Sequence, residues 1–267
     1  MAAVSPSSET LSDLVAVLRA AGCVFAEEEA ALLVAAASSG ADLAAMAARR
    51  VAGEPLEHVV GWAEFRGLRV AVAPGVFVPR QRTAFLVERA ASVTRPGAVV
   101  VDLCCGSGAI GAALATMVAG VQLHAADVDP ASVRCARRNL AGVAAGVYEG
   151  DLFGALPATL RGRVDVLVAN VPYVPSDEVA LMPPEARDHE PRVALDGGDD
   201  GLDVLRRVAD DVSLWLAPGG HLFVESSERQ AATAVGIMAR AGLRAATATS
   251  EDLYATVISG TNGPVPR

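Results

Sequence analysis

Hydrophobic positions in the first fifty residues recur at helical spacing. Leu11, Leu14 and Leu18 lie three or four residues apart, and apolar runs over 26–37 and 41–51 continue this period. Each run ends at small or glycine residues that favour a helix stop. The pattern predicts three helices packed as a small bundle.

The period then changes from helical to alternating. Apolar residues alternate through 64–79, and Pro74-Gly75 interrupts them with a turn signal. We therefore expect a β-hairpin that links the bundle to a second domain. The predicted division is a helical domain over 1–54, a β-hairpin linker over 55–79 and a larger domain over 80–267.

From residue 98 onwards, short apolar runs alternate with helical patterns. Strands are predicted over 98–103, 121–126, 146–149, 164–169, 221–225, 243–249 and 254–259, and helices over 109–118, 131–140, 202–214 and 228–241. A turn is predicted at 218–220, from Pro218-Gly219-Gly220. Such alternation predicts a parallel sheet with helices on both faces. The last two strands are close enough in sequence to pair antiparallel, and the Gly- and Pro-rich stretch 260–267 is expected to fray.

The strand over 164–169 ends at Asn170-Val171-Pro172-Tyr173. In α/β folds the ligand binds beyond the carboxyl ends of the parallel strands, which is where these four residues are expected. Asn170 and the Val171 carbonyl offer hydrogen-bond acceptors, and Pro172 stiffens the backbone before Tyr173. The four residues suit a planar NH2 group as substrate, although a plain Pro-Tyr turn remains the alternative.

The stretch between Tyr173 and Gly201 has little periodicity and many prolines. A loop of this length inside a compact domain is more often functional than decorative. We expect it to fold over a ligand as a lid, with an ordered surface excursion as the alternative.

Composition narrows the class of protein. Apolar residues make up 52% of the 267, but no run approaches the roughly 18 uncharged apolar residues of a membrane span. Glu9 and Asp13 are unlike the basic start of a signal peptide. We expect a soluble, cytoplasmic protein without a membrane partner. The four cysteines lack metal-site spacing and are expected to be small buried residues, with no metal bound.

All 22 basic residues are arginine, because the sequence contains no lysine. This absence excludes a pyridoxal-phosphate Schiff base and a lysine-dependent phosphate loop. The net charge of -9 also opposes unaided binding to a nucleic-acid backbone, so no direct nucleic-acid partner is expected.

A Gly-rich turn follows the strand over 98–103. Gly106, Gly108 and Gly111 satisfy G-x-G-x-x-G, with Asp127 about 20 residues later and Asp151 after the next strand. Glycines allow close approach to a cofactor, and carboxylates at strand ends can accept ribose hydroxyls or an adenine amino group. These features indicate an adenosine-type cofactor. The candidate cofactor-binding residues are Cys104, Cys105, Gly106, Ser107, Gly108, Asp127, Asp151, Leu152 and Asn170.

Two cofactors fit that turn, NAD and S-adenosylmethionine. A dehydrogenase leaves the Asn170 to Tyr173 loop unexplained, whereas a methyltransferase uses it to present an acceptor nitrogen to a sulfonium methyl. S-adenosyl-L-methionine is therefore the expected cofactor. The candidate catalytic residues are Asn170, Pro172 and Tyr173, and Val171 joins them in binding the substrate.

These motifs together resemble the HemK/PrmC-type protein-(glutamine-N5) methyltransferases, in a divergent branch. The matching stretches are the helical N-terminal region, Gly53-Glu54-Pro55-Leu56, Val78-Pro79-Arg80, the 102–108 turn, Asp127, Asp151, Asn170 to Tyr173, Glu190-Pro191-Arg192 and 194–198. The resemblance implies a Rossmann-like class I S-adenosylmethionine-dependent methyltransferase sheet with an antiparallel last strand. It also implies an N-terminal bundle that recognises the substrate, and methyl transfer to a glutamine amide nitrogen, most often in a peptide chain release factor.

Three positions depart from the family pattern. Val171 replaces the first proline of N-P-P-Y but keeps its carbonyl. Arg82 replaces the acid of P-R-P-E-T, which leaves the identity of the protein substrate open. Cys104 replaces the first glycine of the cofactor turn and suggests a slightly different turn there.

Three other functions remain as alternatives. A nucleic-acid amino-methyltransferase acting on adenine N6 or cytosine N4 would use the same loop on a flipped base. A non-catalytic adaptor could retain the fold, although Asn170, Asp127 and the glycines argue against it. An NAD enzyme is the third alternative.

Overall fold

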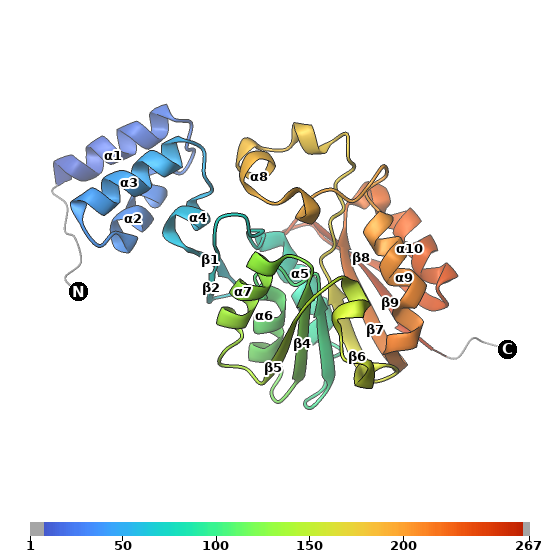
Figure 1. Cartoon of the computed structure of the whole chain (residues 1–267). Helices are drawn as coiled ribbons and strands as arrows, with labels where there is room; N and C mark the ends of the chain where they lie inside the picture. The colour runs from blue at the N-terminus through green and yellow to red at the C-terminus, as the bar shows by residue number, and fades with distance from the viewer. Residues whose placement is uncertain (1–7, 264–267) are drawn as a thin grey trace.

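The computed structural model describes residues 8–263, which form a helical bundle and an α/β domain (Figure 1). The bundle consists of α1 (Ser8–Ala20), α2 (Ala26–Ala36), α3 (Gly40–Val51) and the short α4 (Leu56–Val60). Leu18, Ala30 and Leu33 are fully buried at its centre. The three predicted helices are present. Helix α4 was not predicted, because five residues after Pro55 are too few to show a helical period.

A two-stranded hairpin joins the bundle to the sheet domain. It pairs β1 (Trp62–Phe65) with β2 (Leu68–Ala71), and Arg66 and Gly67 form the turn, both with positive φ. Two positive φ angles are what a two-residue hairpin turn requires. The hairpin predicted around Pro74-Gly75 was therefore placed too far along the chain. Val76 and Val78 are buried without belonging to a strand.

The α/β domain is built on one seven-stranded sheet with the order β5-β4-β3-β6-β7-β9-β8. Its strands are β3 (Val99–Leu103), β4 (Gln122–Asp127), β5 (Ala145–Glu149), β6 (Val164–Ala169), β7 (Leu216–Ser226), β8 (Leu243–Ser250) and β9 (Ala255–Asn262). The first five strands in this order are parallel, and β9 runs antiparallel to both β7 and β8. This confirms the predicted parallel sheet with an antiparallel last strand.

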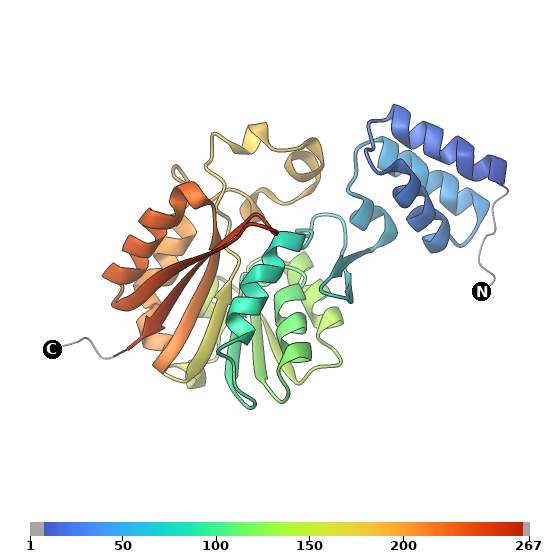
Figure 2. The same cartoon turned by 180° about the vertical axis from the view of Figure 1, so that it is seen from behind.

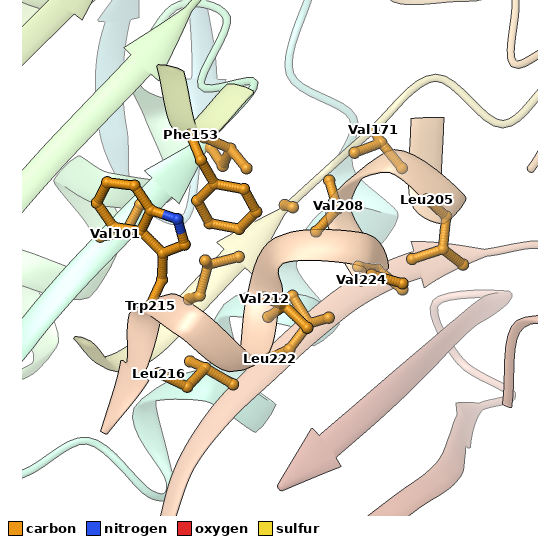
Figure 3. Packing of buried hydrophobic residues seen from close by; sticks show 14 of the residues in the cluster. Val101, Phe153, Val171, Leu205, Val208, Val212, Trp215, Leu216, Leu222 and Val224 are labelled. Atoms are coloured by element: carbon orange, nitrogen blue, oxygen red, sulfur yellow. The ribbon is translucent and has the colours of Figure 1, made fainter. Parts of the chain in front are cut away.

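Helices cover both faces of the sheet (Figures 1 and 2). They are α5 (Ala84–Ala91), α6 (Ala109–Met117) and α7 (Pro130–Asn139) on one face, and α9 (Asp203–Trp215) and α10 (Ala231–Arg240) on the other. Successive residues of a strand point to opposite faces. Val100 accordingly packs with the first group, while Val101 packs with the second. Figure 3 shows this second core, in which Phe153 and Trp215 stack 5.3 Å apart.

Two boundaries in the C-terminal part differ from the prediction. Strand β7 begins at Leu216 rather than at residue 221, and the predicted turn at 218–220 is an irregularity inside it, where Gly219 has a φ of 78° and the pairing with β6 shifts register between Val164 and Val166. The tail expected to fray from Gly260 instead continues β9, since Gly260 pairs with Leu222 and the strand ends at Asn262. Residues 264–267 of that predicted tail lie outside the described residues.

The stretch after Tyr173 is ordered rather than structureless. It contains η4 (Val179–Leu181), α8 (Pro184–His189) and η5 (Arg192–Ala194), and it crosses the top of the domain in Figure 1. We call residues 174–200 the crossing segment. Helix α8 faces the helical bundle, and Glu185 on α8 lies 2.6 Å from Arg50 of α3. Within residues 8–263, no helix is long and apolar enough to cross a membrane.

Candidate functional site

A cavity of about 400 Å³ opens beyond the carboxyl ends of β3, β4, β6 and β7. This is the position at which open α/β sheets bind ligands. One end of the cavity is walled by the turn after β3 and by residues after β4 and β5. We call it the glycine-turn end. The other is walled by the loop after β6 together with Arg82 and Glu225, and we call it the Asn170 end.

The turn after β3 is shaped by its backbone. Cys104, Gly106 and Gly108 all have positive φ, at 56°, 53° and 77°. Cys104 thus adopts the left-handed conformation that glycine favours, at a cost of about 1 kcal/mol. A Cβ added at Gly106 would meet nothing within 4 Å, which leaves the backbone there open to the cavity.

The three glycines of the motif have different surroundings. A Cβ on Gly108 would meet Ala136 of α7 at 3.2 Å, and one on Gly111 would meet Asp102 Oδ2 at 3.1 Å. Gly106 and Ser107 line the cavity, whereas Gly108 and Gly111 do not. The latter two allow close packing around α6, because a side chain at either position would force its neighbours to move.

Asp127 ends β4 and lines the glycine-turn end. Its Oδ2 accepts the Gly106 N–H at 2.8 Å, and its Oδ1 accepts the Asp129 N–H at 2.9 Å. Burial raises the pKa of the Asp127 carboxyl above its usual value. Each oxygen has a second lone pair, so the carboxylate can still accept hydrogen bonds from a ligand.

Asp151 and Leu152 also line this end. Asp151 Oδ2 lies 2.5 Å from Nη2 of Arg207 on α9, and both side chains are more than half exposed. Sequence reasoning missed Arg207, because its 56-residue separation from Asp151 gives no local signal. The pair leaves Asp151 partly neutralised, unlike Asp127, which is held only by backbone N–H groups.

The loop after β6 lines the Asn170 end. Asn170, Val171, Pro172 and Tyr173 all contribute to the wall. The Asn170 side chain has no hydrogen-bond partner among residues 8–263, so its amide is available to a ligand. The Val171 side chain is 3% exposed and belongs to the buried cluster that includes Val208 and Leu205 (Figure 3).

Tyr173 belongs to a polar network at the same end. Its hydroxyl donates to Glu225 Oε1 at 2.8 Å and accepts from Arg82 Nη2 at 2.8 Å. Arg82 Nε also donates to Glu225 Oε1, at 2.9 Å. Burial and the Glu225 carboxylate raise the pKa of the Tyr173 hydroxyl, so it stays protonated at neutral pH. Glu225 was missed as a site residue, although its place at the end of a predicted strand could have indicated it.

The crossing segment closes the cavity from above. Met182, Pro191, Val193, Ala194 and Leu195 contribute to its wall. The segment is fixed by Glu190, whose side chain is fully buried and accepts from Arg80 Nη2 at 2.6 Å and from the Val78 N–H at 3.2 Å. Burial raises the pKa of Glu190, although Arg80 opposes this effect.

Sequence comparisons show which family of proteins the chain is similar to. The family model for the methyltransferase small domain matches residues 67–182. Curated proteins named release factor glutamine methyltransferase are similar to the chain. The one from Streptomyces coelicolor is 44% identical over 68% of this chain and 66% of its own length, and the one from Geobacter sulfurreducens is 39% identical over 74% and 69%. A 4-amino-L-phenylalanine/4-methylamino-L-phenylalanine methyltransferase from Streptomyces pristinaespiralis is 36% identical over 73% and 68%.

Solved structures agree on the fold. A methyltransferase from Pyrococcus furiosus superposes with a TM-score of 0.57 at 16% identity, covering 74% of this chain and 90% of its own. A ribosomal protein L11 methylase from Lactobacillus delbrueckii gives 0.53 at 15% identity, with 73% and 85% covered. The sheet domain therefore has the class I methyltransferase fold. The sequence matches extend over about two-thirds of the relatives' length, and the chain belongs to the release factor glutamine methyltransferase family.

Proposed function

We propose that the protein transfers a methyl group from S-adenosylmethionine to the side-chain amide nitrogen (N5) of a glutamine in a peptide chain release factor. The observation that carries this proposal is that Asn170, whose side chain has no partner in the described part of the chain, opens onto the same cavity as Gly106 and Asp127. A carboxamide acceptor and an adenosine cofactor would therefore meet inside one enclosure. The names of the similar curated proteins support the same reaction and substrate.

The residues at the glycine-turn end fit S-adenosylmethionine. Asp127 would accept the ribose hydroxyls, and the open backbone at Gly106 allows the ligand to approach closely. Cys104, Cys105, Ser107 and Leu152 would form the surrounding wall, and Asp151 would face the adenine. When bound, this cofactor supplies an electrophilic methyl group on a sulfonium.

The Asn170 end must activate a poor nucleophile. The lone pair of an amide nitrogen is shared with its carbonyl, and the same resonance gives a peptide bond a rotation barrier of about 18–20 kcal/mol. Asn170 Oδ1 and the Val171 carbonyl would accept the two N–H bonds of the substrate amide, which raises electron density on nitrogen and orients it. Orientation of this kind is worth roughly 7–11 kcal/mol.

Pro172 and Tyr173 would complete this arrangement. Pro172 fixes the backbone between the acceptor groups and the aromatic ring. The Tyr173 ring would flank the amide, and its face favours a nearby cation by about 0.5–2 kcal/mol. The amide nitrogen would take the methyl group directly, with the cofactor's neutral thioether as the leaving group, so no covalent enzyme intermediate is needed. The proton of the methylated amide would leave to water.

The substrate assignment is tested by supplying labelled S-adenosylmethionine with three acceptors. These are a release factor, a mixture of DNA and RNA, and 4-amino-L-phenylalanine, the last chosen because one relative is named for it. We expect label in the release factor, at a glutamine identified by mass spectrometry. Label in nucleic acid, or in the free amino acid alone, would contradict the proposal.

A further inference from the structure

Glu225 lies beside Asn170 at the Asn170 end of the cavity. Strands β6 and β7 are parallel neighbours, and Ala169 is paired with Val224. Asn170 and Glu225 are the next residues of the two strands, so they extend from adjacent strands at the same edge of the sheet. Neighbouring strands lie about 4.8 Å apart. Both residues line the cavity.

The two carboxylate oxygens of Glu225 have unequal surroundings. Oε1 accepts hydrogen bonds from the Tyr173 hydroxyl and from Arg82 Nε. Oε2 is buried and has no partner in the described part of the chain, while the side chain as a whole is 2% exposed. Because Glu225 lines the cavity and an unpaired buried oxygen is costly, a rotation of its carboxylate that exposes Oε2 to a ligand donor would remove this cost.

Arg82 restricts which donor can bind there. Its guanidinium already balances the Glu225 charge, at 2.9 Å between Nε and Oε1. Because the pair is neutral overall, a cationic donor at Oε2 would gain little charge attraction and would lose more hydration than a neutral N–H. With an acid at position 82, as in the family pattern, the pair would instead carry two negative charges. The Arg82 and Glu225 pair therefore selects a neutral donor.

We propose that Glu225 is a substrate-contacting specificity residue whose Oε2 accepts the backbone N–H of the glutamine being methylated. The inference rests on the proposed function. One glutamine residue can bridge the two strand ends, with its side-chain amide at Asn170 and its backbone N–H at Glu225. The contact restricts the acceptor to a glutamine within a polypeptide, because a nucleobase amine has no such second N–H at that separation.

The first test compares Glu225→Gln with wild type, using a release factor as substrate. The substitution removes the negative charge and can turn an NH2 group toward the substrate N–H, and loss of a charged hydrogen bond weakens binding roughly 10- to 100-fold. We expect KM for the release factor to rise by that factor, while Kd for S-adenosylmethionine measured by calorimetry changes less than about twofold. Glu88→Gln is the matched control, because Glu88 pairs with Arg66 on the surface and does not line the cavity.

The second test removes the donor from the substrate. A release factor with an ester in place of the backbone N–H of the target glutamine should lose a similar factor with wild type. With the Glu225→Gln enzyme, the ester should raise KM little further, since the ester and the substitution remove the same hydrogen bond. Equal KM values for wild type and Glu225→Gln, or additive losses in the double change, would overturn the inference.

The two hypotheses fail in different ways. Wild type that does not methylate the release factor overturns the proposed function and removes the basis of the inference. Wild type that methylates it with no Glu225 dependence overturns the inference alone. A fall in kcat at unchanged KM would also overturn the inference, because it would assign Glu225 to holding Tyr173 rather than to contacting substrate.

Discussion

The two ends of the cavity are built in different ways. At the glycine-turn end, the Asp127 carboxylate is held by the backbone N–H groups of Gly106 and Asp129. At the Asn170 end, Tyr173, Arg82 and Glu225 hold one another through side-chain hydrogen bonds, and Arg82 and Glu225 are 143 residues apart. Backbone hydrogen bonds do not depend on which side chain a residue carries, whereas side-chain hydrogen bonds change with each substitution. The difference explains how one fold can retain a cofactor while its acceptor varies.

The largest expected effect lies at the Asn170 end. Asn170→Ala removes the proposed acceptor for the substrate amide, and loss of one such preorganised group costs roughly 10²–10³ in turnover. Kd for S-adenosylmethionine should stay within about twofold of wild type, as calorimetry would measure. Equal turnover of a release factor by Asn170→Ala and wild type would show that Asn170 does not activate the substrate amide.

The next effect lies at the glycine-turn end. Asp127→Ala should weaken S-adenosylmethionine binding roughly 10- to 100-fold, because it removes a carboxylate acceptor. At saturating cofactor, turnover should recover to near that of wild type. Asp151→Ala is the comparison, and its effect should be smaller because Asp151 is exposed and already paired with Arg207. A larger loss of S-adenosylmethionine binding for Asp151→Ala than for Asp127→Ala would contradict Asp127 as the more important carboxylate.

The stability of the folded protein should depend on pH through Asp102, a residue of β3 just before the glycine turn. Asp102 is fully buried, and burial raises its pKa to about 8. The folded protein therefore keeps this proton between about pH 4 and 8, whereas the unfolded chain loses it near pH 4, so stability falls as pH rises through this window. Asp102→Asn should remove that loss and gain up to about 1.4 kcal/mol per pH unit relative to wild type. Urea unfolding at pH 5 to 8 measures the difference, and a constant difference would contradict it.

The smallest effect concerns the crossing segment above the Asn170 end. Glu185→Gln breaks its ion pair with Arg50, which ties α8 to the helical bundle. Since partly exposed pairs contribute little, KM for a release factor should rise only roughly two- to fivefold, with cofactor binding unchanged. Asp188→Asn is the control on the same helix, because Asp188 pairs locally with Arg187. If Glu185→Gln and Asp188→Asn have the same KM for a release factor, the ion pair between α8 and the helical bundle does not contribute to substrate binding.

Much of the fold was predictable because local patterns carried it. The strand over 164–169 has the predicted bounds, since a β-branched run stops at Asn170 and Pro172. The predicted hairpin was misplaced because the Arg66-Gly67 turn needs a positive φ at a residue that rarely adopts one. The turn predicted at 218–220 is present as an irregularity within β7, because glycines also occur at strand bulges, and only the pairing with β6 shows that the strand continues through it.

The sequence alone determined the order of the seven sheet strands along the chain, the Gly-rich turn, and the loop from Asn170 to Tyr173, because hydrophobic period and local backbone chemistry act over a few residues. Only the tertiary structure decided that Tyr173, Arg82 and Glu225 share hydrogen bonds, that Arg207 pairs with Asp151, and that Gly108 packs against α7. These contacts join elements that are distant in sequence. Their partners are chosen by how the strands and helices pack, and no short stretch of sequence encodes that choice.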